Sequence, residues 1–340
     1  MQLSIQQILE YLEASDPAPL FAEADRLRRR QFGEDVYLRG IIEFSNHCCQ
    51  NCLYCGLRAG NPNIPRYRLT RAEVLKCADQ IAASGIRTIV LQGGEDPDFS
   101  DEWIADMIRA IKMRHDLAIT LSVGERPRRI LENWRDAGAD RYLLRIETFD
   151  RELYRKLRPG REWKDRRKCI ENLRELGYEV GSGFMVGLPG ESLQSLAHSI
   201  QALTEMQLDM IGLGPFVAHP QTPLRDENSG SLDRALQTLA LVRLLNPLTN
   251  MPSTSALESV QAGGRKRGLQ VGANVIMPSF TPDRVRELYN IYPGKNVLEE
   301  SDEDGLESVL RIVHSAGYRV SYARGDSPKY QQPVSQEIEE

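Results

Sequence analysis

Short apolar runs recur along the chain with polar or glycine-containing segments between them. They are rich in Val, Ile, Leu and aromatic residues, as buried β-strands are. Eight strands are predicted on this basis, at 36–44, 88–91, 118–123, 141–144, 178–186, 210–216, 251–254 and 271–277.

Between these runs, apolar residues return at the i, i+3, i+4 spacing of amphipathic helices. Helices are predicted over 71–84, 100–114, 166–176, 192–206 and 232–245. Strand and helix therefore alternate, and parallel strands need helical crossovers of this kind. Because buried parallel strands are continuously apolar, the order favours a (β/α)8 barrel. A doubly wound open sheet shows the same alternation, so periodicity leaves that alternative open.

Helical patterns also occupy both ends of the chain. Two lie within residues 3–31, and one lies within 302–318. We therefore expect four parts, of which the last is polar and ends in acidic residues. They are an N-terminal helical extension over 1–34, a barrel over 35–300, a C-terminal helix over 301–327 and a disordered tail over 328–340.

The composition excludes several classes of protein. Of 340 residues, 41% are hydrophobic and 27% are charged, which suits one sizeable core. The formal net charge of −5 gives no electrostatic reason to expect a nucleic acid or an anionic membrane as partner. The start shows no signal-peptide pattern, and no run of about 18 apolar residues occurs. We expect a globular, cytoplasmic protein.

Four of the six cysteines fall within eight positions after the first predicted strand. Cys48, Cys52 and Cys55 have the spacing C-x3-C-x2-C, and three close thiolates suit a soft metal centre. An iron-sulfur cube with three protein ligands keeps one iron open for another ligand. Zinc is the alternative, but a closed zinc site needs a fourth ligand, and Cys49 lies too close to the others to serve comfortably. One 4Fe-4S cluster is predicted.

This loop, with Tyr54 directly before the last cysteine, resembles the cluster loop of the radical S-adenosylmethionine (SAM) enzymes. In that superfamily the open iron binds the methionine part of SAM, and electron transfer cleaves SAM to a 5′-deoxyadenosyl radical. Three later segments extend the resemblance, at 92–97, 142–148 and 183–191. The resemblance implies a complete (β/α)8 TIM barrel with the site at the carboxyl ends of its strands.

The resemblance also implies roles for particular residues. It places SAM against the glycine turn and against polar residues farther along the chain, with the substrate beside them. The implied cofactor contacts are Tyr54, Gly93, Gly94, Glu95, Ser122, Glu147 and Arg166. The implied substrate pocket contains Gln92, Thr120 and Met277, and the implied catalytic residues are Arg145, Thr254, Ser255 and Tyr289.

Several of these residues also have simpler explanations. Arg145 and Glu147 form the kind of charged pair that is common at protein surfaces. Glu95 and Asp96 are also explained by a solvated turn. Thr254 is of a residue type that often caps the start of a helix.

Within the superfamily, the matching runs are closest to HydE, a group of FeFe-hydrogenase maturases similar in fold to biotin synthase and methylornithine synthase. The resemblance implies an iron complex carrying cysteine, carbon monoxide and cyanide as substrate. It also implies a low-potential electron donor and other hydrogenase maturases as partners. Two features depart from the group: Ile146 stands where many members have His, and no second cysteine group follows Cys169. The matching runs include 39–46, 51–58, 66–68, 122–125, 156–159, 212–216, 272–278 and 292–295.

Two other functions fit the same residues. A radical mutase of the methylornithine synthase type would act on a free amino acid, whereas an iron-sulfur scaffold or electron carrier would not be an enzyme. Cleavage of bound SAM to 5′-deoxyadenosine separates both enzymes from the scaffold. The substrate that raises the cleavage rate separates the two enzymes from each other.

Overall fold

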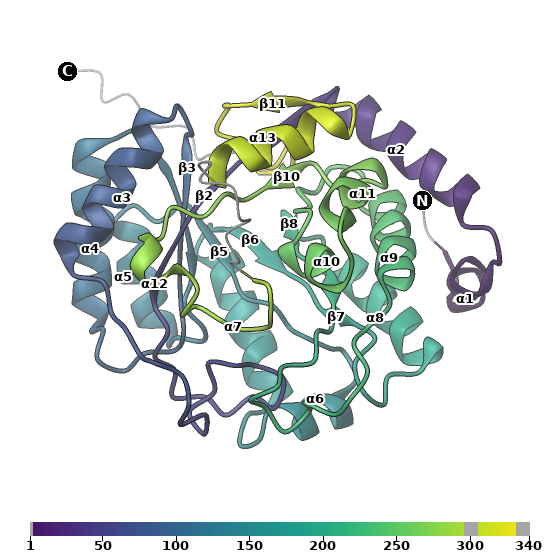
Figure 1. The fold of residues 1–340 in the computed structure, drawn as a ribbon, viewed down its shortest axis with the longest axis horizontal. Helices are drawn as coiled ribbons and strands as arrows, with labels where there is room; N and C mark the ends of the chain where they lie inside the picture. Colours follow the sequence, from purple (N-terminus) through teal and green to yellow (C-terminus); the bar gives the residue numbers. More distant parts are fainter. Residues whose placement is uncertain (1–2, 296–304, 331–340) are drawn as a thin grey trace.

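The computed structural model describes residues 3–295 and 305–330. Its main sheet has six parallel strands that pair in sequence order (Figure 1). Because they are parallel, their carboxyl ends lie at one edge of the sheet. The strands are β2 (Gly40–Ser45), β3 (Thr88–Gly93), β4 (Ala118–Ser122), β5 (Arg141–Leu143), β6 (Glu179–Ser182) and β8 (Met210–Ile211).

Two smaller parallel sheets accompany the main one. One of them includes a strand from the C-terminal part of the chain that the sequence does not predict. The sheets are β7 (Met185–Val186) with β9 (Gly214–Pro215), and β1 (Asp35–Leu38) between β10 (Val275–Ile276) and β11 (Arg319–Ser321).

The prediction of a strand at 251–254 is wrong. Around this segment the described residues form only isolated parallel bridges, Met210 to Asn250 and Pro252 to Val275. Proline has no backbone N–H, so Pro252 cannot donate a ladder hydrogen bond. The other predicted strands are present, three of them divided into two shorter strands.

Helices surround the strands (Figure 1). The five predicted helices are confirmed as α3, α4, α7, α8 and α9, with small differences at their ends. In α4 the buried residues Ile104, Ile108 and Ile111 recur on one face, as the apolar spacing predicts. The helices that follow the first strand are α3 (Arg71–Ala83), α4 (Asp101–Arg114), α5 (Arg128–Asp136), α6 (Arg151–Leu157), α7 (Trp163–Glu175), α8 (Leu193–Glu205), α9 (Leu232–Leu245), α10 (Ser255–Val260), α11 (Gly264–Gln270), α12 (Asp283–Arg286) and α13 (Gly305–Ser315).

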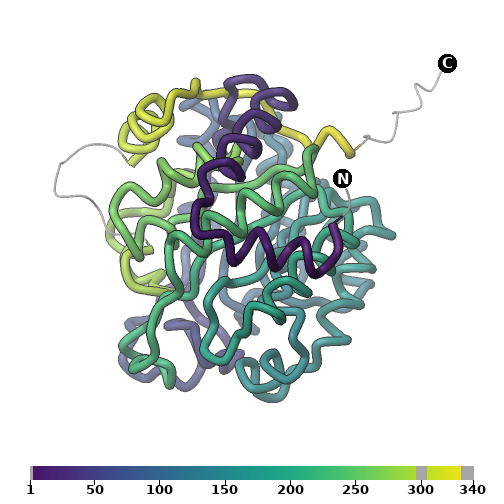
Figure 2. Tube along the Cα trace, turned by 90° about the vertical axis from the view of Figure 1, so that its right-hand side faces the viewer, coloured from purple at the N-terminus to yellow at the C-terminus, as the bar shows by residue number. Residues whose placement is uncertain are grey.

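Two helices precede the first strand, α1 (Ile5–Glu13) and α2 (Ala18–Phe32). They pack on the outside of α9, where Figure 2 shows the N-terminal segment crossing the later helices. The apolar side chains of Ile8 and Leu12 are buried there. Among the described residues, no helix combines the length and apolarity needed to cross a bilayer.

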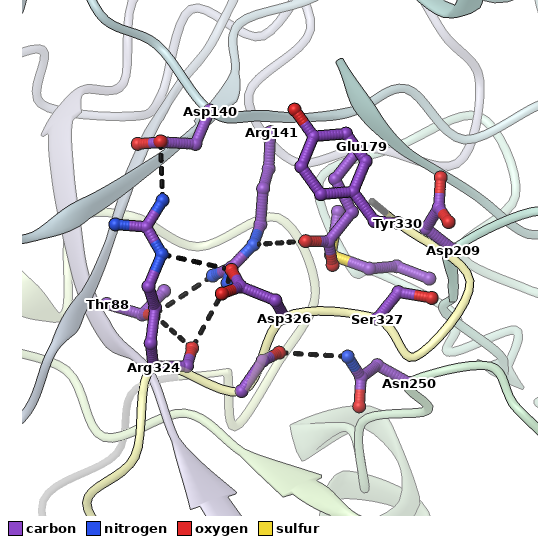
Figure 3. A network of polar contacts seen from close by, with 12 residues as sticks. Thr88, Asp140, Arg141, Glu179, Asp209, Asn250, Arg324, Asp326, Ser327 and Tyr330 are labelled. Carbon is purple, nitrogen blue, oxygen red and sulfur yellow. Dashed lines mark hydrogen bonds and ion pairs between the residues drawn. The ribbon is translucent and has the colours of Figure 1, made fainter. Parts of the chain in front are cut away.

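A C-terminal strap, defined as residues 322–330, crosses the amino ends of the main strands (Figure 3). The carbonyl oxygen of Arg324 accepts hydrogen bonds from the Thr88 hydroxyl at 2.8 Å and from Arg141 Nη2 at 3.1 Å. The carbonyl oxygen of Gly325 accepts one from Asn250 Nδ2 at 2.9 Å. The strap therefore supplies hydrogen-bond acceptors at the amino ends of the main strands, whereas Cys48, Cys52 and Cys55 follow the carboxyl end of β2.

Charged side chains also pair at the amino ends of the main strands. Arg141 is fully buried and its Nε donates to Glu179 Oε2 at 2.8 Å. Its Nη2 contacts the carboxylate of Asp326, which also accepts from Arg324 Nε at 3.0 Å (Figure 3). The strap thus supplies a second negative partner for a buried guanidinium.

The strap includes the first residues of the segment for which the sequence predicts disorder. Lys329 and Tyr330 are placed, and the Tyr330 hydroxyl donates to the carbonyl oxygen of Gly177 at 2.9 Å. The remainder of that segment, 331–340, lies outside the described residues.

Replacing Asp326 by alanine should destabilise the fold. The change leaves buried Arg141 with Glu179 as its remaining carboxylate partner, and the expected loss is about 1 to 3 kcal/mol of unfolding free energy. Thermal melting measures it. Asp226→Ala is the matched control, since Asp226 is exposed and its one ion pair with a described residue is with the adjacent Arg225. This change should alter stability by less than about 0.5 kcal/mol. Equal melting temperatures for the two variants would contradict the role given to Asp326.

Candidate functional site

One cavity of about 230 Å³ lies where the main strands reach their carboxyl ends. Its wall is built from the cysteine loop (residues 46–58) after β2 and the glycine turn (residues 92–97) at the end of β3. Residues at and after the ends of β4 and β5 complete the wall. The predicted site residues that line it are Cys48, Cys52, Tyr54, Cys55, Gln92, Gly93, Gly94, Glu95, Ser122, Arg145, Glu147, Arg166 and Tyr289.

A larger hollow of about 1140 Å³ lies elsewhere, near the ends of α7 and α8 and beside Lys329 and Tyr330. None of the predicted site residues lines it. We therefore take the smaller cavity, which holds the chemically reactive side chains, as the candidate site.

The cysteine loop is fixed to its surroundings mainly through its backbone. Arg66 donates to four carbonyl oxygens, those of Asn46 at 2.6 Å, Leu57 at 2.9 Å, Arg58 at 2.9 Å and Asn61 at 3.4 Å. Such a fork of donors holds both ends of the loop at once. The side chain thus keeps the loop in one conformation without occupying the cavity.

The three predicted ligands are free, half-buried thiols that line the same cavity. Burial raises the pKa of Cys48 to about 11 and also raises the pKa of Cys55. Buried thiols of this kind become thiolates when a metal supplies the compensating positive charge. Cys49, by contrast, is exposed and does not line the cavity. The donors suit an iron-sulfur cluster.

No set of three His, Cys, Asp or Glu side chains converges on a single metal position within the described residues. The three thiols face one cavity but are not gathered around one point. In a 4Fe-4S cube each thiolate binds a different iron. The arrangement is therefore compatible with a cube.

The glycine turn packs directly against the cysteine loop. A Cβ atom on Gly94 would lie 2.1 Å from the carbonyl oxygen of His47 and 2.8 Å from Cys48 Cβ. The backbone N–H of Cys49 also donates to the carbonyl oxygen of Glu95 at 2.9 Å. Only glycine permits this close approach, so Gly94 brings the two segments of the wall together.

Asp96 does not form the solvated turn that its sequence context also suggested. It is 3% exposed and accepts hydrogen bonds from the Ser45 hydroxyl at 2.6 Å and from Arg68 Nε at 2.7 Å. Burial alone would raise the pKa of Asp96, but the hydrogen bonds from Arg68, Ser45 and the backbone of Asp98, with the charge of Arg68, together outweigh it, and the pKa lies below its usual value. The buried carboxylate anchors the glycine turn to the end of β2.

Glu147 has an uncommon backbone conformation, with φ at 72°. This left-handed region is sparsely populated by residues other than glycine, and residues held there cluster at functional sites. Hydrogen bonds hold the backbone in place, because the N–H of Glu147 donates to Gly183 and its carbonyl oxygen accepts from Met185, each at 3.1 Å. The conformation fixes the direction of the carboxylate, which lines the cavity.

Arg145 and Glu147 present polar atoms that no protein group satisfies. Arg145 Nε and Glu147 Oε2 are 3.2 Å apart. Neither atom, nor Arg145 Nη2, makes a hydrogen bond with any described residue, although all three are buried. Buried polar atoms are normally paired, so these atoms indicate a ligand in the cavity. The charged pair that the sequence also suggested is present, but it lies at the cavity and is largely buried, so it differs from an ordinary surface pair.

Five charged side chains form a network at one side of the cavity. Arg166 Nη1 lies 2.8 Å from Glu125 Oε1, and Arg161 Nη2 lies 3.0 Å from Glu125 Oε2. Arg158 is 3.6 Å from Glu125 and 3.9 Å from Glu95. Burial alone would raise the pKa of Glu125, but the neighbouring Arg166 outweighs it and the pKa is lowered. The network fixes the direction in which Arg166 reaches the cavity.

Sequence reasoning missed Glu125, Arg158 and Arg161 as members of this site. Glu125 follows Ser122 at the end of β4, so its position after a strand was the available signal. Arg158 and Arg161 come from the loop between α6 and α7, whose place beside the cavity no periodicity shows.

Four predicted site residues do not line the cavity. Ser255 is one contact away, because its hydroxyl lies 2.9 Å from the hydroxyl of Tyr292, which does line it. The Thr254 hydroxyl donates to the carbonyl oxygen of Leu213 at 3.0 Å and does not cap α10. Thr120 is buried in β4, and Met277 is half-buried beyond β10.

Ile146 points into the core. It is fully buried among the apolar side chains of the main cluster and does not line the cavity. Its backbone N–H donates to the Ser182 hydroxyl at 3.1 Å. The difference from the His of many HydE sequences therefore lies behind the cavity wall.

A closing loop, defined as residues 288–295, covers the cavity from the other side. Asn46 Nδ2 donates to the carbonyl oxygen of Leu288 at 2.9 Å, and Lys295 Nζ lies 2.9 Å from the buried carboxylate of Glu43. Tyr289 and Tyr292 of this loop line the cavity. Contacts with the end of β2 thus hold the closing loop and the cysteine loop together.

Comparison with known proteins gives the same family from sequence and from fold. Residues 42–203 match the model of the radical SAM superfamily. The chain is 47% identical to the [FeFe] hydrogenase maturase subunit HydE of Thermotoga maritima, over 88% of this chain and 85% of that protein. It is 30% identical to the 3-methylornithine synthase of Methanosarcina acetivorans, over 88% and 84%.

Solved structures of two proteins share the fold. Methylornithine synthase (PylB) superposes with a TM-score of 0.83 at 26% identity, over 94% of this chain and 95% of that one. The maturase HydG of Carboxydothermus hydrogenoformans superposes with a TM-score of 0.79 at 20% identity, over 95% and 76%. At 20% identity the second likeness concerns the fold alone. With a cysteine loop and a polar cavity at the carboxyl ends of its parallel strands, the chain belongs to the radical SAM superfamily of enzymes.

Proposed function

We propose that this radical SAM enzyme acts in FeFe-hydrogenase maturation, as a HydE-type enzyme working on a cysteine-bound iron carbonyl cyanide precursor. The observation that carries the proposal is the similarity to the Thermotoga HydE, which extends over most of both chains. Radical SAM enzymes use a 4Fe-4S cluster and SAM, so the chain must hold both. We also propose that the enzyme works with a low-potential electron donor and with other hydrogenase maturases.

In the proposed site, Cys48, Cys52 and Cys55 hold the cluster. When bound and reduced, the cluster would supply the one electron with which SAM divides into methionine and a 5′-deoxyadenosyl radical. Glu147 is proposed to bind SAM, because its carboxylate atom Oε2 is buried and makes no hydrogen bond with a described residue, although Arg145 Nε lies 3.2 Å from it. Arg166 would bind beside it, oriented by its ion pair with Glu125.

The other cofactor contacts are proposed from the same wall. The backbone of Gly93 and Gly94, together with Glu95 and Ser122, would hold the amino end of SAM, and Tyr54 would lie near the adenine. All five line the cavity with the three thiols. Glu95 also accepts a hydrogen bond from Gln50 Nε2 at 2.8 Å, which fixes its carboxylate.

Arg145 is the proposed centre of the substrate pocket. Its buried Nη2 makes no hydrogen bond with a described residue, and its Nε lies near Glu147 without forming one, so the guanidinium is available to a carboxylate or another anionic group. Gln92 and Tyr289 line the same space. Ser255 would act on the substrate through Tyr292, and the structure supports no direct contact for the three other expected residues, Thr120, Thr254 and Met277.

We also propose that the barrel is complete and spans residues 35–300. Isolated parallel bridges continue the main sheet from Met210 to Asn250, from Pro252 to Val275, and from Ser279 back to Ile41. These bridges connect the last strand of the six-stranded sheet back to its first strand, which supports a closed barrel.

A radical mutase of the methylornithine synthase type is the second candidate. It is favoured by the similarity to the Methanosarcina synthase and by the shared fold. The two candidates differ in substrate, since the mutase acts on a free amino acid and the maturase on an organometallic complex. An iron-sulfur scaffold is not supported, because the chain belongs to an enzyme superfamily.

An anaerobic maturation assay tests the proposed function. Purified protein, SAM and a reductant, added to the other maturases and an apo-hydrogenase, should restore hydrogen evolution. Arg145→Ala and Glu147→Ala should keep the cluster and lower the restored activity about 100-fold or more, because misplacement of a bound reactant costs this much. Restoration without this protein, or stimulation of SAM cleavage by a free amino acid, would contradict the maturase and in the second case favour the mutase.

The ligand assignment predicts which cysteine substitutions remove the cluster. Cys52→Ala should lose it, because two thiolates cannot hold the cube, whereas Cys49→Ala should retain about four irons per chain. Iron and sulfide analysis with electron paramagnetic resonance measures both variants under anaerobic conditions. Cys49 is the matched control, since it belongs to the same loop but is exposed. A full cluster in Cys52→Ala would show that the assignment is wrong.

Ile146→His should affect stability and leave SAM cleavage unchanged. A polar ring in this fully buried apolar position should cost about 2 kcal/mol or more, because it loses its hydrogen bonds with water. Thermal melting measures the loss, and Ile146→Val, costing about 1 kcal/mol, is the control for volume. Changed basal SAM cleavage in a variant of unaltered stability would instead place position 146 in the SAM site.

A further inference from the structure

A basic surface lies on the outer side of α6. Residues 151–164 contain six Lys or Arg against two Glu, in a chain whose formal net charge is −5. We define the α6 basic surface as Arg151, Arg155, Lys156 and Lys164, all exposed. Within the described parts of the chain, no ion pair neutralises any of the four. Unpaired charges of one sign attract a partner of the opposite sign.

The α6 basic surface also borders a hollow. A hollow of about 310 Å³ opens between α6 and the start of α7. It is lined by four basic residues, two acidic residues and two aromatic residues, which are Arg151, Arg155, Arg161, Lys164, Glu152, Glu162, Tyr154 and Trp163. The guanidinium of Arg151 lies 5.0 Å from the centre of the Trp163 ring. This cation–π contact keeps Arg151 at the rim of the hollow. A partner would therefore meet a partly preformed site.

The opposite side of α6 packs on the cysteine loop. Leu153 and Leu157 are buried against Leu53 and Tyr54, which lie between two of the proposed cluster ligands. The backbone N–H of Leu53 also donates to the carbonyl oxygen of Leu157 at 2.9 Å. A single helix, about 10 Å across, thus separates the basic surface from the cysteine loop.

We propose that the α6 basic surface docks an acidic one-electron carrier protein that reduces the cluster. This inference rests on the reductive cleavage of SAM and is independent of which substrate the enzyme uses. At each encounter the carrier loses one electron and the cluster gains it, and no atom or proton is exchanged. A small anion bound on the outside of α6 would not reach the cavity, whereas a protein docked there comes within one helix of the cysteine loop. Complementary charge speeds such encounters and orients them.

Charge reversal on α6 tests the proposal, with flavodoxin as the acidic carrier. In Arg155→Glu/Lys156→Glu, SAM cleavage driven by reduced flavodoxin should fall about tenfold or more at low salt, because like charges now face each other. Cleavage driven by dithionite should stay unchanged, since dithionite needs no docking surface. Calorimetry should show a similar loss of affinity for oxidised flavodoxin. Both differences should shrink at about 1 M salt, where the Debye length is about 3 Å.

The matched control reverses two charges elsewhere. Arg30 and Lys76 are exposed, have no ion pair with a described residue, and lie on α2 and α3, well away from α6 (Figure 1). Arg30→Glu/Lys76→Glu makes the same change in net charge and should leave flavodoxin-driven cleavage and flavodoxin affinity unchanged. Equal losses in the two double variants would mean that only net charge matters, and would overturn the proposal.

Other outcomes are equally decisive. Unchanged flavodoxin affinity in the α6 variant overturns the proposal, even if the enzyme shows no SAM cleavage at all. Loss of dithionite-driven cleavage at full cluster content would mean that the surface serves the cavity, which also overturns it. Failure of the wild type to cleave SAM with dithionite would refute the proposed function, and the affinity measurement would still judge the docking surface. If the reversal lowers the melting temperature, Arg155→Gln/Lys156→Gln removes the charges without repulsion and should give a smaller loss of the same kind.

Discussion

The parallel register of the first strands is the constraint on which the site depends. Glu43 of β2 pairs with Gln92 of β3, and Gln92 pairs with Ser122 of β4. The chain therefore leaves each of these strands at the same level of the sheet. The cysteine loop, the glycine turn and Glu125 each come after one of these strand ends. Backbone hydrogen bonds within the sheet therefore align groups that are far apart in the sequence. Residues that follow β5, with Arg145 and Glu147, complete the wall in the same way.

The sequence carried enough information for most of the elements and for the position of the site. Apolar periodicity predicted α4 within a residue, because that helix buries one apolar face. It also predicted the bounds of α9, although that helix is buried on all sides from Ala235 to Leu245. The C-x3-C-x2-C spacing predicted the ligand loop because its chemistry is local. The segment near Pro252 was predicted as a strand for its place in the alternation, and it failed because one missing N–H interrupts a ladder that is already short.

What the sequence could not supply are relations between distant side chains. Asp96 looks like part of a polar turn until Ser45 and Arg68 are seen to enclose it. Glu125 and Arg161 become partners only when the loop after α6 folds back over the end of β4. The left-handed backbone at Glu147 is a tertiary effect, since no local signal favours it in a residue with a side chain. These features depend on packing, and a pattern of apolar and polar positions does not encode them individually.

The C-terminal strap has a consequence for how the protein is made. Ribosomes deliver the chain from its N-terminus, and neighbouring parallel strands of the main sheet can pair as they emerge, domain parts folding in order of synthesis. Arg141 and Glu179 meet early, but Asp326 and the carbonyl groups of the strap arrive only after all the strands of the main sheet have been made. Until then, the amino ends of the main strands are open to water and to proteases. Synthesis of residues 322–330 is thus the event that covers the end of the sheet remote from the cysteine loop.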